Sequence, residues 1–225
     1  MAQSTDLLTL PREAYLAWHR LAHLAAAELH PSWREHCLPP EIARWLDTAT
    51  PTAAVWTALS AQIERQLGLR PVTTDPPRPG RLLGWLPAPA LTALTARLGI
   101  TLLGRPLRHT LARAEVEVQR LALGDELYRF GIDQALLLHD AEPPASDRPE
   151  RDWAERVAVM GIAGWREALA DERLWERVRL KLPRPQVEAA EAEGGPALPS
   201  VQRLCLRLCR EFDPRWYSLF AKSTA

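Results

Sequence analysis

The chain has 225 residues, 47% of them hydrophobic, and its 28 basic and 28 acidic side chains give a formal net charge of zero. This length supports a buried core without disulfides, and the zero balance argues against a general binder of nucleic acid or anionic membrane. The three cysteines lack framework spacing and fit a reducing cytosol. The N-terminus shows no signal-peptide pattern, and no window approaches the roughly 20 apolar residues of a membrane span, so we expect a soluble cytoplasmic protein.

The first third of the chain predicts helices, because its apolar residues recur every three or four positions. Helices are expected from Pro11, from Pro39 and from the Thr50–Pro51 pair, because proline suits a first turn. Gly68 is expected to end the last of them. Residues 70–81 contain four prolines and no apolar period. They are interpreted as an exposed connector, which is favoured over a PxxP ligand for another protein.

The stretch 85–138 is predicted to form the core, because it holds the longest sustained apolar period in the chain. A short helix is expected to end at Gly99, and a longer helix is expected between Gly104 and Gly124. One face of the longer helix should point inward and carry Leu107, Leu111, Ala114, Val118 and Leu121. Truncating Leu111 to alanine is accordingly expected to cost about 2–5 kcal/mol.

The last third of the chain predicts two further connectors, near 140–150 and 184–199, the second of them mobile. Between them we expect a helix over 151–169 and a brief extended segment over 179–183, where apolar residues alternate. A last long helix is expected after Ser200, which can cap it.

The predicted fold class is mainly α, because strand-like alternation is nearly absent. We expect a single compact helical domain over 1–225, with proline-rich connectors and at most a minor extended segment. The nine tryptophans are spread along the chain and are interpreted as core anchors rather than a binding platform. The C-terminal segment with Trp216 and Phe220 is apolar and should dock on its own domain or on a partner.

No enzymatic signature is present, since the P-loop, dinucleotide-binding, zinc-protease and hydrolase motifs are all missing from the sequence. We therefore expect no catalysis and no cofactor. Cys205 and Cys209 are favoured as packing residues over metal ligands. His30, His36 and Cys37 lie close in sequence, but their spacing matches no standard site, so no metal is expected.

A basic face is predicted on the helix that follows Gly104. Arg105, Arg108 and Arg113 lie away from the apolar stripe and could dock an acidic partner. The alternative is a solvated face, because Arg113 and Glu117 can pair four residues apart. A helix-turn-helix reader of DNA is disfavoured, since its candidate second helix, 125–130, carries two acids and one arginine.

Short motifs in the same order across most of the chain resemble those of the YscK/SctK family of type III secretion proteins. The central motif is ARLGITLLGRPLRH, with Arg97, Leu98, Gly99, Leu102, Gly104, Leu107 and Arg108 at the matching positions. The opening LPREAYL, the RLKLP block after Trp175 and the closing stretch 205–222 also resemble the family. The HPSW segment and the connectors 76–79 and 185–199 depart from it and resemble loop insertions.

The resemblance implies a non-enzymatic adaptor in the cytosolic sorting platform of the injectisome, peripherally associated with the inner-membrane apparatus. Such adaptors link the cytoplasmic forkhead-associated-type domain of the inner-membrane ring protein (SctD) to the pod protein (SctQ), so the expected partners are proteins and not nucleic acid or membrane. The expected partner-binding residues are Arg105, Arg108, Arg113, Trp216 and Phe220. A cytosolic secretion chaperone or an unrelated helical scaffold is the alternative.

Overall fold

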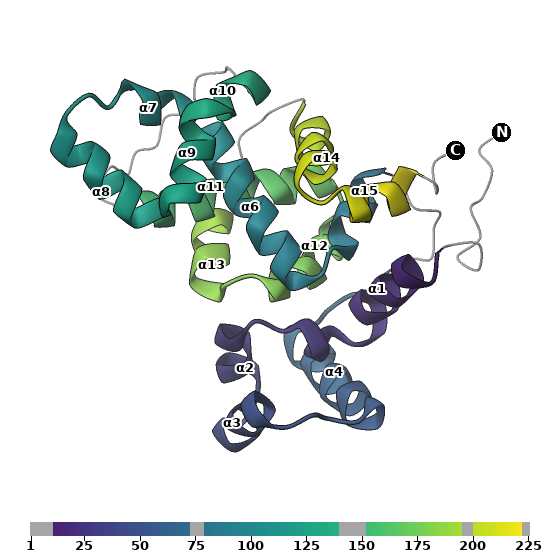
Figure 1. Cartoon of the computed structure of the whole chain (residues 1–225). Helices are drawn as coiled ribbons and strands as arrows, with labels where there is room; N and C mark the ends of the chain where they lie inside the picture. The colour runs from purple at the N-terminus through teal and green to yellow at the C-terminus, as the bar shows by residue number, and fades with distance from the viewer. Residues whose placement is uncertain (1–10, 73–78, 140–151, 195–199, 222–225) are drawn as a thin grey trace. The chain divides into compact units, whose positions relative to one another are not determined.

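The structure is a computed structural model that describes residues 11–72, 79–139, 152–194 and 200–221. These residues form helices α1 to α15 and three short 3-10 helices, and no strand occurs among them (Figure 1). The prediction of a mainly α fold is therefore confirmed.

Contacts between Cα atoms divide the chain into two compact units, each built from several stretches of sequence. Unit 1 comprises Met1–Leu91, Leu169–Pro185 and Pro214–Ala225, and unit 2 comprises Thr92–Ala168 and Gln186–Asp213. The expectation of one domain over the whole chain stays a prediction.

Unit 1 begins with helices whose ends follow the proline and glycine pattern of the sequence. Pro31 and Pro40 stand in the first turns of α2 and α3, and Gly68 ends α4 with a left-handed φ of 62°. The elements are α1 (Arg12–His23), η2 (Ala25–Glu28), α2 (Pro31–Cys37), α3 (Pro40–Thr48), α4 (Ala53–Leu67), α5 (Pro79–Leu82), η3 (Leu83–Trp85), α12 (Glu172–Val178), η4 (Arg179–Lys181) and α15 (Pro214–Ala221).

Two buried cations join segments of unit 1 that lie far apart in the sequence. Lys181 is 3% exposed, pairs with Glu28 at 2.6 Å and donates to the carbonyl oxygen of Leu86 at 2.8 Å. Burial lowers the pKa of Lys181, and the Glu28 carboxylate opposes that shift. Arg177 is 4% exposed and pairs with Glu64 at 2.8 Å. Because a buried charge is costly without a partner, each pair specifies which segments must meet.

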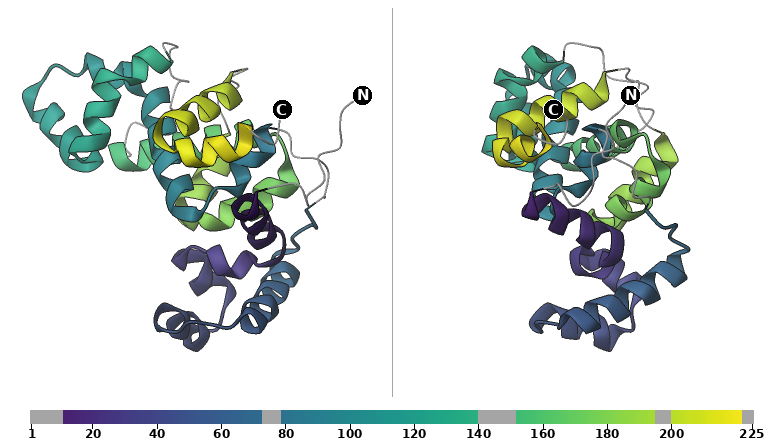
Figure 2. Two further views of the ribbon diagram at one scale, coloured as in Figure 1. Left: turned by 45° about the vertical axis from the view of Figure 1, so that its right-hand side comes forward. Right: turned by 90° about the vertical axis from the view of Figure 1, so that its right-hand side faces the viewer.

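Unit 2 is mostly built from α6 (Ala88–Leu102), α7 (Gly104–His109), α8 (Arg113–Leu123), α9 (Asp125–Asp133), α10 (Ala135–Leu138), α11 (Trp153–Leu169), α13 (Arg184–Glu193) and α14 (Val201–Phe212). Helix α9 contacts α7, α8 and α10, and Figure 2 shows this part of unit 2 from two further sides. Phe212 of α14 packs its ring edge-on against Phe130 of α9, with the centroids 5.2 Å apart.

The centre of unit 2 is a close contact between α6 and α11. A β-carbon on Gly99 would lie 1.9 Å from the backbone oxygen of Val157, and one on Gly161 would lie 2.0 Å from that of Thr95. No side chain fits at such distances, so these two glycines allow the helix backbones to touch. The prediction that Gly99 ends a helix was wrong, because the residue lies inside α6 and serves this contact.

The connector predicted over 184–199 was wrong for its first part, because Arg184–Glu193 form α13. Alanine and glutamate are strong helix formers, and Val187 and Ala190 are buried, which anchors the helix. The segment 179–183 was expected to be extended, but it begins with the 3-10 helix η4.

The other two connectors fall largely on residues that the structure leaves undescribed. Arg70–Val72 are not helical, whereas α5 begins at Pro79, inside the connector predicted over 70–81. Residues 73–78 and 195–199, and the whole connector near 140–150, lie outside the described residues.

The single helix predicted between Gly104 and Gly124 is two helices, α7 and α8, because residues 110–112 are not helical. The break resets the helical phase, so the later residues no longer share a side with Leu107. Leu107 is buried, as expected, but the inward stripe was wrong for the residues that follow. The exposed fractions are 91% for Leu111, 62% for Val118 and 88% for Leu121.

The interpretation of the tryptophans as core anchors is confirmed for five of the nine. The buried ones are Trp18, Trp33, Trp85, Trp165 and Trp175. Trp33 also donates its indole N–H to the carbonyl oxygen of Leu182 at 3.0 Å, which satisfies the ring's one polar group. Of the other four, Trp45 of α3 is 43% exposed, and Trp56, Trp153 and Trp216 are half-buried.

Candidate functional site

The three arginines of the predicted basic face lie on two helices. Arg105 and Arg108 are exposed on α7, and Arg113 is exposed at the start of α8. Because residues 110–112 interrupt the helix, the prediction that all three share one helical face was wrong. Arg113 pairs with Glu117 at 3.1 Å, as the alternative of a solvated face anticipated.

The apolar stripe that sequence periodicity identified lies on the surface of unit 2. Leu111 in the link before α8 and Ala114, Val118 and Leu121 on α8 are all exposed, and we call these four residues the outer face of α8. The opposite side of α8 carries the buried Gln119, whose side-chain Nε2 donates to Thr110 Oγ1 at 2.7 Å. This bond holds α8 against the α7–α8 link and thereby leaves the apolar stripe outward.

Charged side chains beside the outer face of α8 pair within unit 2. Arg113 pairs with Glu117, and Arg120 forms a bidentate pair with Asp125 at the start of α9. The hydrogen bond from Arg120 holds the pKa of the Asp125 carboxyl below its usual value. Arg113 and Arg120 therefore present little uncompensated positive charge along α8.

The C-terminal helix α15 lies beside α1 within unit 1. Trp216 is half-buried and lines a cavity of about 200 Å³ with Leu16, Ala17 and Pro87. Arg215 of α15 pairs with Glu13 of α1 across the same cavity. The apolar tail is therefore docked on its own unit at Trp216. The side chain of Phe220 lies outside the described residues.

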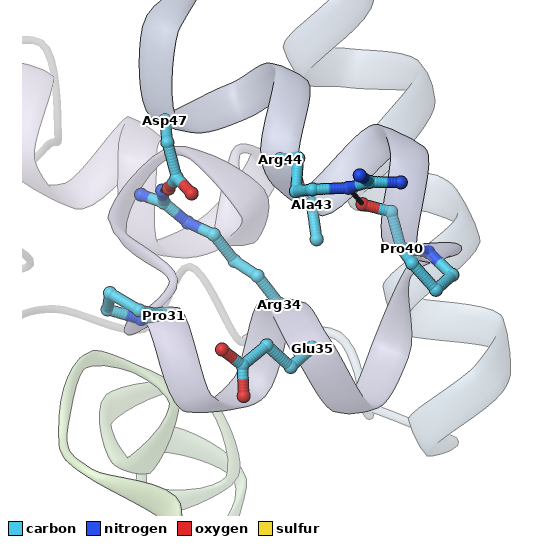
Figure 3. Close-up of a pocket in the computed structure, with 7 residues that line it drawn as sticks. All are labelled: Pro31, Arg34, Glu35, Pro40, Ala43, Arg44 and Asp47. Carbon is cyan, nitrogen blue, oxygen red and sulfur yellow. Dashed lines mark hydrogen bonds and ion pairs between the residues drawn. The ribbon is translucent and has the colours of Figure 1, made fainter.

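A second cavity, of about 230 Å³, lies between α2 and α3 (Figure 3). Arg34 reaches across it to Asp47, with 3.2 Å between the guanidinium and the carboxylate. Arg44 turns to the Pro40 carbonyl oxygen, which its Nε meets at 3.2 Å. The cavity is smaller than the roughly 300–1,000 Å³ of typical ligand pockets, and its Arg34–Asp47 pair is internally neutral.

Of the residues that sequence reasoning weighed as metal ligands, the three cysteines are buried, His30 caps a helix and His36 is exposed. Cys205 and Cys209 are fully buried, and burial raises the pKa of both thiols, that of Cys209 to about 12. His30 accepts the Ser32 N–H at 3.3 Å and caps α2. Cys37 is buried and its pKa is raised. In the part of the chain that the structure describes, no group of three histidine, cysteine or acidic side chains is placed to hold a metal ion.

Sequence reasoning missed the buried cations Lys181 and Arg177. Their carboxylate partners lie far away in the sequence, Glu64 being 113 positions from Arg177. No local pattern connects such residues. A charged residue inside an apolar block, such as Lys181 in RLKLP, was the one available signal.

The model of the family described as YOP proteins translocation protein K (YscK) matches residues 15–221 of the chain. Searches of curated proteins and of solved structures found no significant match. The family match covers nearly all of the sequence and includes every helix from α2 to α15. The chain belongs to the YscK family of type III secretion proteins.

Proposed function

We propose that this protein is a non-enzymatic adaptor of a type III secretion injectisome. It links the cytoplasmic domain of the inner-membrane ring protein (SctD-like) to the pod protein of the sorting platform (SctQ-like). The observation that carries the proposal is the family match over residues 15–221. The exposed apolar and basic residues around α7 and α8 support it, because an adaptor needs surface that its own fold does not cover.

The adaptor works on the cytoplasmic side of the inner membrane, peripherally attached through the ring protein. Among the described residues, no helix is both long and apolar enough to cross a bilayer. Attachment through protein contacts is consistent with this finding.

Two surfaces are assigned to the two partners. The exposed cations Arg105, Arg108 and Arg113 dock an acidic surface of the ring domain, where charge raises the association rate and suppresses wrong partners. The tail with Trp216 and Phe220 takes part in the second contact. Trp216 is half-buried beside α1, so part of its side chain is exposed to solvent.

Co-purification with separately expressed ring domain and pod protein tests the linking function. The chain should bind each protein alone and should form a ternary complex with both. Recovery of neither protein, or of complexes that exclude one another, would contradict a linking role.

The basic surface is tested by charge reversal. Arg108→Glu should fold normally and bind the ring domain more weakly, with a defect that shrinks as salt is added because rim charges are screened. Arg203→Glu, on the exposed side of α14, is the matched control and should bind normally. Normal ring binding by Arg108→Glu at low salt would rule the basic surface out. Binding of the Phe220→Ala variant to the ring domain and to the pod protein tests the C-terminal segment in the same way.

A further inference from the structure

We propose that the outer face of α8 docks one amphipathic helix of a partner protein. That helix lies along Leu111, Val118 and Leu121 and carries acidic residues at the end next to Arg108. This inference rests on the proposed adaptor function and names the chemistry of one of its contacts.

The spacing of the exposed residues fits a partner helix. Ala114, Val118 and Leu121 of α8 step by four and three positions, the pattern with which one helix meets another, and Leu111 lies in the non-helical link just before α8. Helix α8 has 11 residues, which corresponds to about 16 Å or three turns of contact. The alternative of strand addition requires an exposed sheet edge, and the described residues include no strand.

The size of the face favours a single helix over a second copy of this chain. Burial of one large apolar side chain contributes about 2–3 kcal/mol, which at about 25 cal/mol per Å² corresponds to about 100 Å² of apolar surface. Leu111, Val118 and Leu121 together therefore present on the order of 300 Å² of apolar surface. A standard protein interface buries about 800 Å² on each partner. The outer face of α8 is too small for a stable dimer and is of the size that one docked helix covers.

The charges around the face indicate at which end of the partner helix its acidic residues lie. Along α8 the flanking arginines Arg113 and Arg120 are already paired with Glu117 and Asp125. Before the N-terminal end of α8, Arg108 of α7 is exposed and makes no ion pair within the part of the chain that the structure describes. A partner with apolar residues along its length and acids at one end therefore complements both features.

The first test uses the purified ring domain and pod protein as probes. Leu121→Glu and Val118→Glu should each weaken binding to one of these two proteins about tenfold or more, because each removes apolar burial and places a charge in the contact. The matched control is Leu137→Glu, on α10, since Leu137 is 76% exposed but lies outside the face. All three variants should melt like the unsubstituted chain, because the residues are exposed.

The second test maps the occupant. A photo-crosslinking amino acid in place of Leu121 should label a helical segment of the bound protein with apolar residues three and four apart and acids at one end. Labelling of a strand or loop, or of a second copy of this chain, would overturn the inference. Sedimentation of the free chain as a dimer that Leu121→Glu dissociates would overturn it as well.

The outcomes separate the inference from the function on which it rests. If the unsubstituted chain binds its partners and both α8 variants bind equally well, the inference is wrong and the adaptor function stands. If the unsubstituted chain binds neither protein, the proposed function fails, and the assignment of this face to a partner helix fails with it.

Discussion

Unit 1 and unit 2 hold their helices together by different means. Unit 1 relies on buried charges, Lys181 with Glu28 and Arg177 with Glu64. Unit 2 relies on small residues, since Gly99 and Gly161 allow α6 and α11 to touch. Unit 1 should therefore be sensitive to the removal of charge, and unit 2 to the addition of volume. The outer face of α8 belongs to neither pattern, because no described residue of unit 2 covers it.

The largest effect is expected from added volume in unit 2. Gly161→Ala places a β-carbon 2.0 Å from the Thr95 backbone oxygen, so the helices must separate. We expect a loss of about 4 kcal/mol or more in the free energy of unfolding, at the upper end of single substitutions. Chemical denaturation measures it.

Gly164→Ala, on the same helix, is the control for that substitution. Its nearest neighbour would be the Leu98 Cδ2 methyl at 3.1 Å, which a flexible side chain can withdraw, and alanine favours helix by about 1 kcal/mol. Its stability should change by no more than about 1 kcal/mol. Equal losses for Gly161→Ala and Gly164→Ala would mean that close backbone approach is not what holds α6 and α11.

Removal of charge from unit 1 should have the next largest effect. Glu28→Ala leaves the Lys181 ammonium buried without its carboxylate and should cost about 3–5 kcal/mol. Glu13→Ala, which breaks only the exposed pair with Arg215, should cost less than about 1 kcal/mol.

The pH dependence of the Glu28→Ala variant identifies the buried charge as the cause. Burial lowers the pKa of Lys181, so between the folded and unfolded pKa values the unfolded state binds more protons. Stability therefore rises with pH in that window, and the loss should shrink as the pH approaches the unfolded lysine value of about 10.4. A loss that is the same at neutral and alkaline pH would instead point to lost packing.

A third comparison sets a buried leucine of unit 2 against an exposed one. Leu98 of α6 is fully buried, and Leu98→Ala should cost about 2–5 kcal/mol. Leu111→Ala, for which the sequence predicts a similar loss, should change stability by less than about 0.5 kcal/mol, because Leu111 is 91% exposed. Thermal or urea unfolding of both variants measures these losses. A large loss of stability for Leu111→Ala would support the original prediction that the stripe faces the core.

The smallest effect is expected from His30 in unit 1. Burial, with a contribution from Arg34, lowers the pKa of His30 below its ordinary 6.5. The unfolded state then binds more protons between the two values, so stability is fully present above about pH 6.5 and declines as the pH falls through the folded value. The decline should be small, because the His30 ring is only partly buried.

His30→Asn separates this titration from the capping role of the residue. Asparagine can cap α2 through its side-chain oxygen but does not titrate in this range. The melting temperature of the variant should fall less between about pH 7.5 and pH 5.5 than that of the unsubstituted chain. An unchanged decline would assign the pH dependence to other groups.

Local signals in the sequence were enough to predict most helix positions. Proline in first turns and the left-handed Gly68 fix several helix ends, and apolar periodicity located α4, α11 and α14. Periodicity also found the apolar stripe of α8, but it could not tell what covers a stripe. The inward or outward choice depends on the break at residues 110–112 and on the bond between Gln119 and Thr110, which are tertiary features.

The glycine contact and the buried charge pairs were beyond the reach of local signals. A glycine after an apolar run resembles a helix stop, and only the approach of α11 distinguishes Gly99 from one. Lys181 and Glu28 lie in segments with no shared pattern. Sequence analysis found the basic residues of the candidate site, because residue charge can be read from the sequence. It did not predict that these residues are divided between α7 and α8.

Hydrogen exchange of α8 in the free and the bound protein tests the central claim most directly. The amides of residues 113–123 should exchange more slowly once the ring domain or the pod protein is bound at saturation, because a docked helix covers the outer face of α8. The amides of α10, which carries the exposed control Leu137, should be unaffected. Unchanged exchange across α8 in a saturated complex would contradict the claim that this face is where the protein receives a partner.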